Sequence, residues 1–549
     1  MRNPQSPKNN THLTNSLIGG LKESNSRLNR SGKARIRHWA PKVKTGCMTC
    51  RIRRVKCDET KPVCQRCSST GRKCDGYNSV PPGPPTTVLS VVQMPSYWEV
   101  VSSNPVETES FRFFHSVTIP TLAGFFDQGR WARRLLQMSH RYPALWHAMT
   151  AVACIHRDFI ANSTPITMSR MQDSSQVRLA LQQWNKSIQS LQELLSGQVL
   201  TKFDRLVILS VCILFITMSS LQGRLWQAFV HINSGLKLIH QWKLADKGED
   251  QRDEDSDLDV LLVLFTQLDS QARPYLPSLS NNLQWTDKQI ILSSSTNPFK
   301  SLLEACVALE VHFNKMMQIY TNNSIYIDGL DAGMQIKRQQ CLLGLTEWDA
   351  RLDKYLGRTP QPENGKALKL LYVRRRLAQV ALSMDLTEGE LAHDDFVEDY
   401  AYMLRLMGDI LGDPMDPLDS QPADIDQSQN MSFHLETITT EPLFLIALRC
   451  REPTIRRQAI RLLRQYPRRE GICEGMAALK IAERVMEIEE ECLSSPENAC
   501  ARGNWICENH RVTWLQFFLV HDRQARTVVH TREDLLHGQP GREIVTTYW

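Results

Sequence analysis

The stretch CMTCRIRRVKCDETKPVCQRCSSTGRKC, from Cys47 to Cys74, holds six cysteines at the spacing C-x2-C-x6-C-x6-C-x2-C-x6-C. The pattern of Cys47–Cys57 recurs in Cys64–Cys74, so the segment consists of two equivalent halves. It contains almost no apolar core, because Val55 and Val63 are nearly all that it offers. We therefore expect a bound metal to supply its folding free energy, on the order of 10 kcal/mol or more.

The number of cysteines bears on how many metal ions the segment holds. A structural zinc ion takes four tetrahedral thiolate or imidazole ligands. Six cysteines could serve one ion and leave two sulfurs unused, or serve two ions if two sulfurs bridge them. The repeated half-site favours two ions. Residues 1–44 are polar and show no secretory signal, so we expect a reducing compartment, where clustered cysteines bind metal more often than they form disulfides.

Positive charge is concentrated in the same part of the chain. Residues 1–80 hold 18 Lys or Arg against four acidic residues, a net charge of +14 within a chain of 549 residues whose total is +6. The remainder therefore carries −8. A basic terminal module joined to a mildly acidic body is typical of a nucleic-acid binder, and the plainer alternative is a basic tail without a partner.

The cysteine segment resembles the DNA-binding domain of fungal Zn2Cys6 binuclear cluster transcription factors. The resemblance covers the six cysteines, the basic run Arg51–Lys56, the following Asp58-Glu59, and Lys61-Pro62 between the halves. It implies two Zn2+ ions per chain and CGG-type triplets read in the DNA major groove. The implied ligands are Cys47 and Cys64, which bridge the ions, and the terminal Cys50, Cys57, Cys67 and Cys74.

The basic residues of this segment are the predicted DNA contacts. Two Zn2+ and six thiolates sum to −2, so the cluster alone would repel DNA. On a short helix Arg51 and Arg54 would share one face, and Arg53 and Lys56 the next. By their place in the family motif, Arg53 and Arg54 are the predicted base readers. The predicted phosphate contacts are Arg51, Lys56, Arg66, Arg72 and Lys73, some of which could instead be solvated charges.

The rest of the chain predicts a mostly α protein. We expect a disordered basic segment at 1–44, a Zn2Cys6 domain at 45–76, a Pro-rich linker at 77–107 and an all-α helical regulatory domain at 108–549. Apolar residues recur every three or four positions at 181–195, 302–320 and 481–492. The acidic segments 245–259 and 412–429 are interpreted as solvated loops, with transcription activation segments as the alternative.

The body offers no signal of an enzyme. It lacks the common catalytic motifs, and His147, His156 and His231 lie in apolar helices, where a buried, hydrogen-bonded histidine is expected. The nine cysteines outside the cluster are interpreted as small core residues. Eight arginines within 449–469 form either a solvated helical face or a second phosphate contact. The apolar run 206–218 is too short to span a bilayer and predicts a buried helix.

Segments of the body, at 110–127, 142–156 and 442–471, also resemble the helical regulatory region that follows many fungal binuclear clusters. The sequence therefore predicts a nuclear, DNA-binding regulator of RNA polymerase II transcription. Its expected partners are double-stranded DNA and transcription machinery or co-regulators. The linker carries no heptads, so the protein either binds as a monomer or dimerises through the helical body. The rival hypotheses are a protein-docking scaffold and an enzyme within the body. The basic run from Lys33 to Lys56 is a candidate nuclear import signal.

Overall fold

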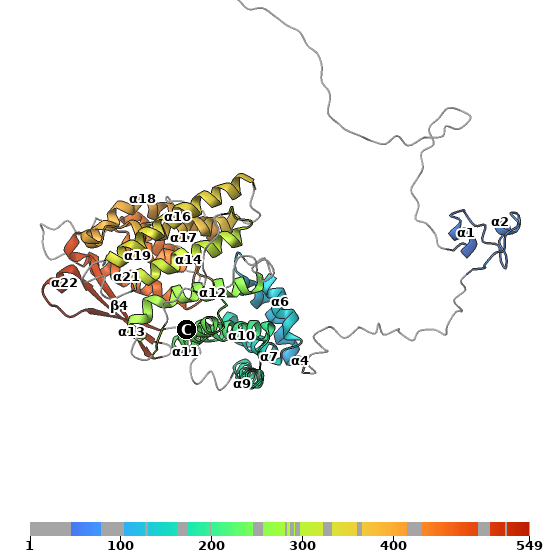
Figure 1. The fold of residues 1–549 in the computed structure, drawn as a ribbon, viewed down its shortest axis with the longest axis horizontal. Coiled ribbons are helices and arrows are strands. Elements are labelled where there is room, and N and C mark those ends of the chain that lie inside the picture. Colours follow the sequence, from blue (N-terminus) through green and yellow to red (C-terminus); the bar gives the residue numbers. More distant parts are fainter. Residues whose placement is uncertain are drawn as a thin grey trace, which may run out of the picture. The chain divides into compact units, whose positions relative to one another are not determined.

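The computed structural model divides the chain into two compact units, Met1–Gln93 and Met94–Trp549. It describes residues 45–77, 104–126, 130–161, 174–197, 199–244, 256–279, 283–285, 290, 297–321, 332–358, 365–413, 431–491, 506–521 and 524–547. The predicted N-terminal segment, most of the linker and most of both acidic segments lie outside these residues. The first unit contains α1 (Met48–Ile52) and α2 (Gln65–Ser68), and the second is a mostly α body, as the sequence predicts (Figure 1).

Helices make up most of the described body. In chain order they are α4 (Pro105–Phe113), the π-helix η1 (Phe114–Thr118), α5 (Ile119–Ala123), α6 (Arg130–Ser139), α7 (Pro143–Ala161), α9 (Ser175–Leu195), α10 (Lys202–Leu221), α11 (Leu225–Gln241), α12 (Ser256–Ala272), η3 (Arg273–Tyr275), α13 (Leu276–Leu279), α14 (Leu302–Tyr320), α16 (Ala332–Arg358), α17 (Gly365–Ser383), η4 (Leu386–Phe396), α18 (Val397–Leu411), α19 (Thr440–Arg449), α20 (Pro453–Gln465), α21 (Gly475–Glu490), η5 (Glu508–His510) and α22 (Arg532–Leu536).

Helix α10 lies at the centre of the N-terminal half of the body. It begins at a capping box in which Thr201 and Asp204 exchange side-chain and backbone hydrogen bonds, and every residue from Leu206 to Leu221 is buried. By length and composition this helix alone, among the described residues, could cross a membrane, but 89% of its apolar window is buried inside the protein. The prediction of a buried helix is therefore confirmed.

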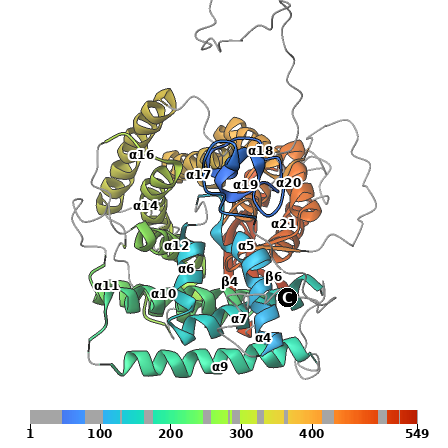
Figure 2. The same ribbon diagram turned by 90° about the vertical axis from the view of Figure 1, so that its right-hand side faces the viewer.

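The predicted apolar stripe of α9 is only partly covered. Figure 2 shows α9 lying along α7, and the ring of Trp184 stacks on Phe215 of α10 at a centroid distance of 4.0 Å. The fully buried positions are instead Val177, Ala180, Gln183 and Ser187, while Leu181 and Leu195 stay exposed. The buried face of α9 is therefore rotated by about one residue position from the face that carries the predicted leucines.

The body also contains two small sheets that the all-α prediction did not include. β1 (Ser432–His434) pairs in parallel with β2 (Arg468–Glu470), which pairs antiparallel with β3 (Cys473–Glu474). β4 (Val512–His521), β5 (Gln524–Thr531) and β6 (Arg542–Thr547) form an antiparallel meander at the end of the chain.

The second sheet escapes the sequence pattern because half of the buried positions of its middle strand, β5, are threonine. β5 alternates strictly between half-exposed and buried residues, and its buried face is Ala525, Thr527, Val529 and Thr531. Threonine is a good strand former but counts as polar, so the period of two is hidden in a search for apolar residues. α21 covers this face with Ile481, Val485 and Ile488. These three were predicted core positions.

Candidate metal centre

Six cysteine sulfurs converge in the first unit. They form two sets of four, Cys47, Cys64, Cys67, Cys74 and Cys47, Cys50, Cys57, Cys64, within each of which the sulfur atoms lie within 4.8 Å of one another. Both sets include Cys47 and Cys64, whose sulfurs are 3.5 Å apart. Four-sulfur sets of this kind suit tetrahedral zinc, and the two shared sulfurs stand where bridging ligands would be needed.

The backbone of each half holds its cysteines in the same way. Cys47 precedes α1 and its sulfur accepts a hydrogen bond from the backbone N–H of Cys50 at 3.4 Å. Cys64 precedes α2 and accepts one from the N–H of Cys67 at 3.3 Å. The first cysteine of each half thus caps a short helix, and the second, one turn later, points to the same centre.

Both helices end in the same hydrogen-bonded turn. Val55 N–H donates to the carbonyl of Cys50 at 3.1 Å, and Arg72 N–H donates to that of Cys67 at 3.0 Å. Such a turn requires a left-handed residue before the donor. In the second half this residue is Gly71 (φ +64°), whereas in the first it is Arg54 (φ +54°). A non-glycine residue there costs about 1 kcal/mol.

This turn corrects one prediction about the basic run. The helix ends at Ile52, and Arg54 is left-handed, so the expected shared faces of Arg51 with Arg54 and of Arg53 with Lys56 do not form. The physical reason is that the third cysteine of the half, Cys57, must return to the sulfur cluster, which a continuing helix would prevent.

Side chains outside the cysteines tie the two halves together. The carboxylate of Asp58 accepts hydrogen bonds from Gln65 N–H at 2.8 Å and Arg66 N–H at 2.9 Å, at the start of α2. Its bond from the Thr60 hydroxyl, and then these backbone bonds, hold the pKa of Asp58 well below its usual range. Thr49 donates to Asp75 at 2.8 Å and so fastens α1 to the end of the module.

Tyr77 lies one residue beyond the module predicted from the sequence and was not among the predicted site residues. Its hydroxyl is 3.4 Å from the sulfur of Cys57 and donates to the carbonyl of Thr60 at 3.1 Å. The Cys57 sulfur accepts bonds from the N–H groups of Cys47 and Glu59, both at 3.4 Å. The contact with Tyr77 and these two backbone bonds outweigh burial and lower the pKa of Cys57 to about 6. No spacing rule marks such a tyrosine in advance.

The cluster needs a cation at its centre. Cys47, Cys50, Cys64 and Cys67 are fully buried, and burial raises the pKa of the Cys47 thiol to about 12 and also raises that of Cys50. Thiolates are the form that binds metal, and a buried thiolate without a nearby positive charge is unfavourable. The donor set of six sulfurs therefore fits zinc.

The predicted DNA contacts differ in exposure. Arg53 is half-buried and donates from Nη1 to the Thr70 hydroxyl at 3.4 Å, across the two halves. The other six basic side chains, which are Arg51, Arg54, Lys56, Arg66, Arg72 and Lys73, are exposed. The described module carries eight Lys or Arg and three acidic residues, so its surface is basic around a buried sulfur centre.

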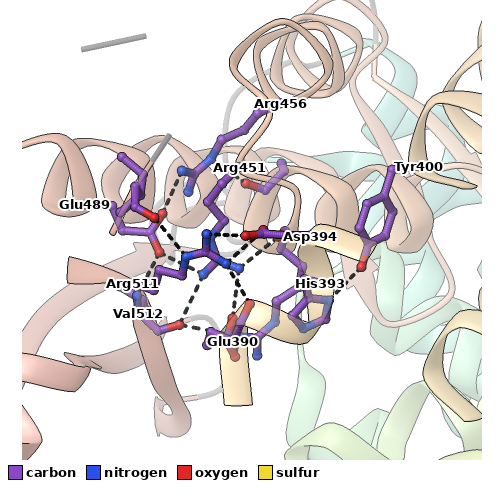
Figure 3. A network of polar contacts seen from close by, with 12 residues as sticks. Glu390, His393, Asp394, Tyr400, Arg451, Arg456, Glu489, Arg511 and Val512 are labelled. Carbon is purple, nitrogen blue, oxygen red and sulfur yellow. Dashed lines mark hydrogen bonds and ion pairs between the residues drawn. The ribbon is translucent and has the colours of Figure 1, made fainter. Parts of the chain in front are cut away.

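The second predicted charged surface, the arginines of 449–469, is built differently from either expectation. Its ion pairs are Arg449–Glu390, Arg451–Glu390, Arg451–Glu489, Arg456–Glu489, Arg457–Glu490, Arg461–Asp413 and Arg464–Glu483. Arg451 and Arg456 are buried, and Figure 3 shows both directed at Glu489. These guanidinium groups join elements of the body, which explains the charge without a phosphate ligand.

Two regions of the chain match known domain families. Residues 45–82 match the fungal Zn(2)-Cys(6) binuclear cluster domain, and residues 109–345 match the fungal specific transcription factor domain. The chain therefore belongs to the fungal Zn2Cys6 transcription regulators, a family whose cluster domain binds zinc and DNA. No solved structure gives a significant match.

Among named relatives, the aspercryptin biosynthesis cluster-specific transcription regulator atnN of Emericella nidulans is 26% identical over 441 residues, 72% of this chain and 67% of that protein. The transcription regulator lscL of Purpureocillium lilacinum is 27% identical over 208 residues, 35% of this chain and 48% of lscL. The transcriptional regulatory protein moc3 of Schizosaccharomyces pombe is 64% identical over 36 residues, 7% of each chain. The chain thus spans less than half the length of two of these three relatives.

Proposed function

We propose that this protein is a zinc-dependent, sequence-specific regulator of RNA polymerase II transcription that acts in the nucleus and reads CGG-type triplets in the major groove. The observation that supports it best is the pair of four-sulfur sets sharing Cys47 and Cys64, surrounded by exposed basic side chains. The family membership supports the DNA-binding role, and the basic run of the cysteine module supports the choice of target.

In this proposal two zinc ions occupy the cluster. Cys47 and Cys64, which belong to both four-sulfur sets, would each be a ligand of both ions, and Cys50, Cys57, Cys67 and Cys74 would complete the two ligand sets. When bound, zinc supplies the positive charge that lets six buried thiolates coexist, and hence the folding free energy of the module. This proposal keeps the domain limits predicted from the sequence, which are 45–76 for the cluster and 108–549 for the regulatory body.

The proposed base readers are Arg53 and Arg54. Arg54 is exposed at the turn after α1, where its guanidinium could pair with guanine O6 and N7. Arg53 would exchange its contact with Thr70 for one with DNA. The proposed phosphate contacts are Arg51, Lys56, Arg66, Arg72 and Lys73, all exposed.

The body is proposed as the regulatory part of the molecule. Transcription machinery or co-regulators are its proposed partners, and a second copy could bind through it, which would place two clusters on paired triplets. The proposed import signal runs from Lys33 to Lys56; its part up to Lys44 and most of both acidic segments lie outside the described residues.

The test is selection from a random duplex library, with residues 1–110 and with the full chain, in the presence and absence of a zinc chelator. Zinc-dependent enrichment of a CGG-like triplet supports the proposal. One triplet from both proteins indicates a monomer, whereas paired triplets from the full chain alone place the dimer contact in the body. No enrichment with zinc bound would reject DNA reading and favour a protein-docking scaffold.

A further inference from the structure

Cys507 is the one described cysteine of the body that departs from the prediction of a core residue by being exposed. The described cysteines that do lie in the core are Cys154, Cys212, Cys306, Cys341 and Cys450, and Cys473 is partly covered. A cysteine at the surface is open to reagents in solution, so its immediate neighbours decide what it can do.

The sulfur of Cys507 lies 3.1 Å from Nδ1 of His510. The other ring nitrogen of His510, Nε2, lies 3.2 Å from the Glu533 carboxylate. The three groups therefore stand in a row, with a nucleophile, a base and an acid that orients the base. Because the sulfur and the carboxylate meet opposite edges of the imidazole, they do not converge on one point as metal ligands would.

The backbone holds this row in place from two segments. Cys507 precedes the short helix η5, and the His510 N–H donates to the Cys507 carbonyl at 3.2 Å. Glu533 lies in the first turn of α22, and the Arg532 N–H donates to the Arg511 carbonyl at 3.1 Å, which joins α22 to η5. His510 is only 7% exposed, so its ring has little freedom to leave the row.

Arg511 anchors the same turn to the body. Its guanidinium donates to the Ile506 carbonyl at 3.0 Å, immediately before Cys507, and to the Asp394 carboxylate at 2.7 Å. Figure 3 shows Arg511 beside Asp394 within the buried polar network. The position of Cys507 is thus fixed by long-range contacts rather than by a loose surface loop.

We propose that Cys507, His510 and Glu533 form a covalent modification site for soft carbon electrophiles of the α,β-unsaturated carbonyl class. His510 takes the thiol proton, and the sulfur electron pair forms a C–S bond to the β-carbon as the C=C π bond breaks. The displaced electron pair passes to the α-carbon, which then receives the proton from the His510 imidazolium. Glu533 is a positioning residue that stabilises this imidazolium.

The probe is N-ethylmaleimide at limiting concentration and pH 7 with the zinc-loaded full chain, followed by peptide mapping to measure the modification rate of each cysteine. We expect native Cys507 to react first among the cysteines of the body, and about tenfold faster than the same cysteine in the urea-denatured chain. Equal rates in native and denatured protein would overturn the proposal, and this comparison requires no variant.

Variants then assign the base. His510→Asn should slow native Cys507 about tenfold, and Glu533→Gln should slow it less, with the circular dichroism spectrum and urea midpoint of each checked against the parent. The matched control is His521→Asn, at the exposed end of β4, which should leave the rate unchanged. An unchanged rate in a folded His510→Asn protein would refute the role of the imidazole. DNA selection by the cysteine module is measured separately and does not depend on either result.

Discussion

The buried carboxylate of Glu489 should be among the most sensitive single positions in the body. It is fully buried, accepts from Arg451 at 2.9 Å and from Arg456 at 2.7 Å, and also accepts the Val512 N–H at 2.7 Å (Figure 3). It therefore joins α20, the turn before it and β4 to α21 through a single charge. Glu489→Gln keeps the size of the side chain but removes that charge.

The expected cost follows from what the substitution leaves behind. Arg451 and Arg456 are both buried, so the loss of the Glu489 charge leaves Arg456 without its carboxylate partner and leaves Arg451 with Glu390 alone. Breaking a buried ion pair by removing one partner costs about 3–5 kcal/mol. With a urea m-value of about 3 kcal/mol/M, the midpoint of urea unfolding should fall by on the order of 1 M.

The assay is urea unfolding of the full chain followed by circular dichroism at 222 nm. The matched control is Glu487→Gln on the same helix, because Glu487 is exposed and pairs with the exposed Arg484 at 3.0 Å. Exposed pairs contribute about 0–1 kcal/mol, so its midpoint should hardly move. A Glu489→Gln midpoint as close to the parent as that of the control would refute the reasoning that this network stabilises the body.

Three further results are expected. A zinc chelator should make residues 45–77 sensitive to protease while the helical signal of the body persists, since sulfur and metal form the core of that module; continued resistance would contradict this. Arg54→Gly should weaken selection of the triplet by about 1–3 kcal/mol without loss of module stability, because glycine tolerates φ +54°, whereas Gly71→Ala should cost about 1 kcal/mol of stability and spare the base contact. Burial lowers the pKa of His156 to about 4 and that of His393 to about 3, so the unfolded chain takes up protons first. The stability that these histidines contribute should be complete above about pH 6.5 and fall on acidification towards pH 4, by on the order of 1–3 kcal/mol each, which urea midpoints at pH 7 and pH 4.5 would measure.

The sequence alone determined the features that contiguous residues encode. The spacing of six cysteines fixes which sulfurs can meet, because each half is one short helix and one return of the chain. A three-to-four residue period fixes a helix, so α10, α14 and α21 were predictable in position and largely in burial. Even the buried state of His156, now seen bonded to Thr118 at 3.0 Å, followed from its apolar surroundings in the sequence.

Tertiary structure decided the rest, because the partners lie far apart in the chain and no spacing rule links them. Arg511 meets Asp394 across 117 residues. Arg451 meets Glu489 across 38, so the arginine-rich segment 449–469 forms ion pairs between elements of the body, with Arg451 and Arg456 buried. The proposed reactivity of Cys507 likewise depends on tertiary structure, because α22 brings the Glu533 carboxylate to the His510 ring. The left-handed conformation of Arg54 follows the end of α1. It turns the chain so that the Cys57 sulfur can meet the sulfur of Cys64 from the other half.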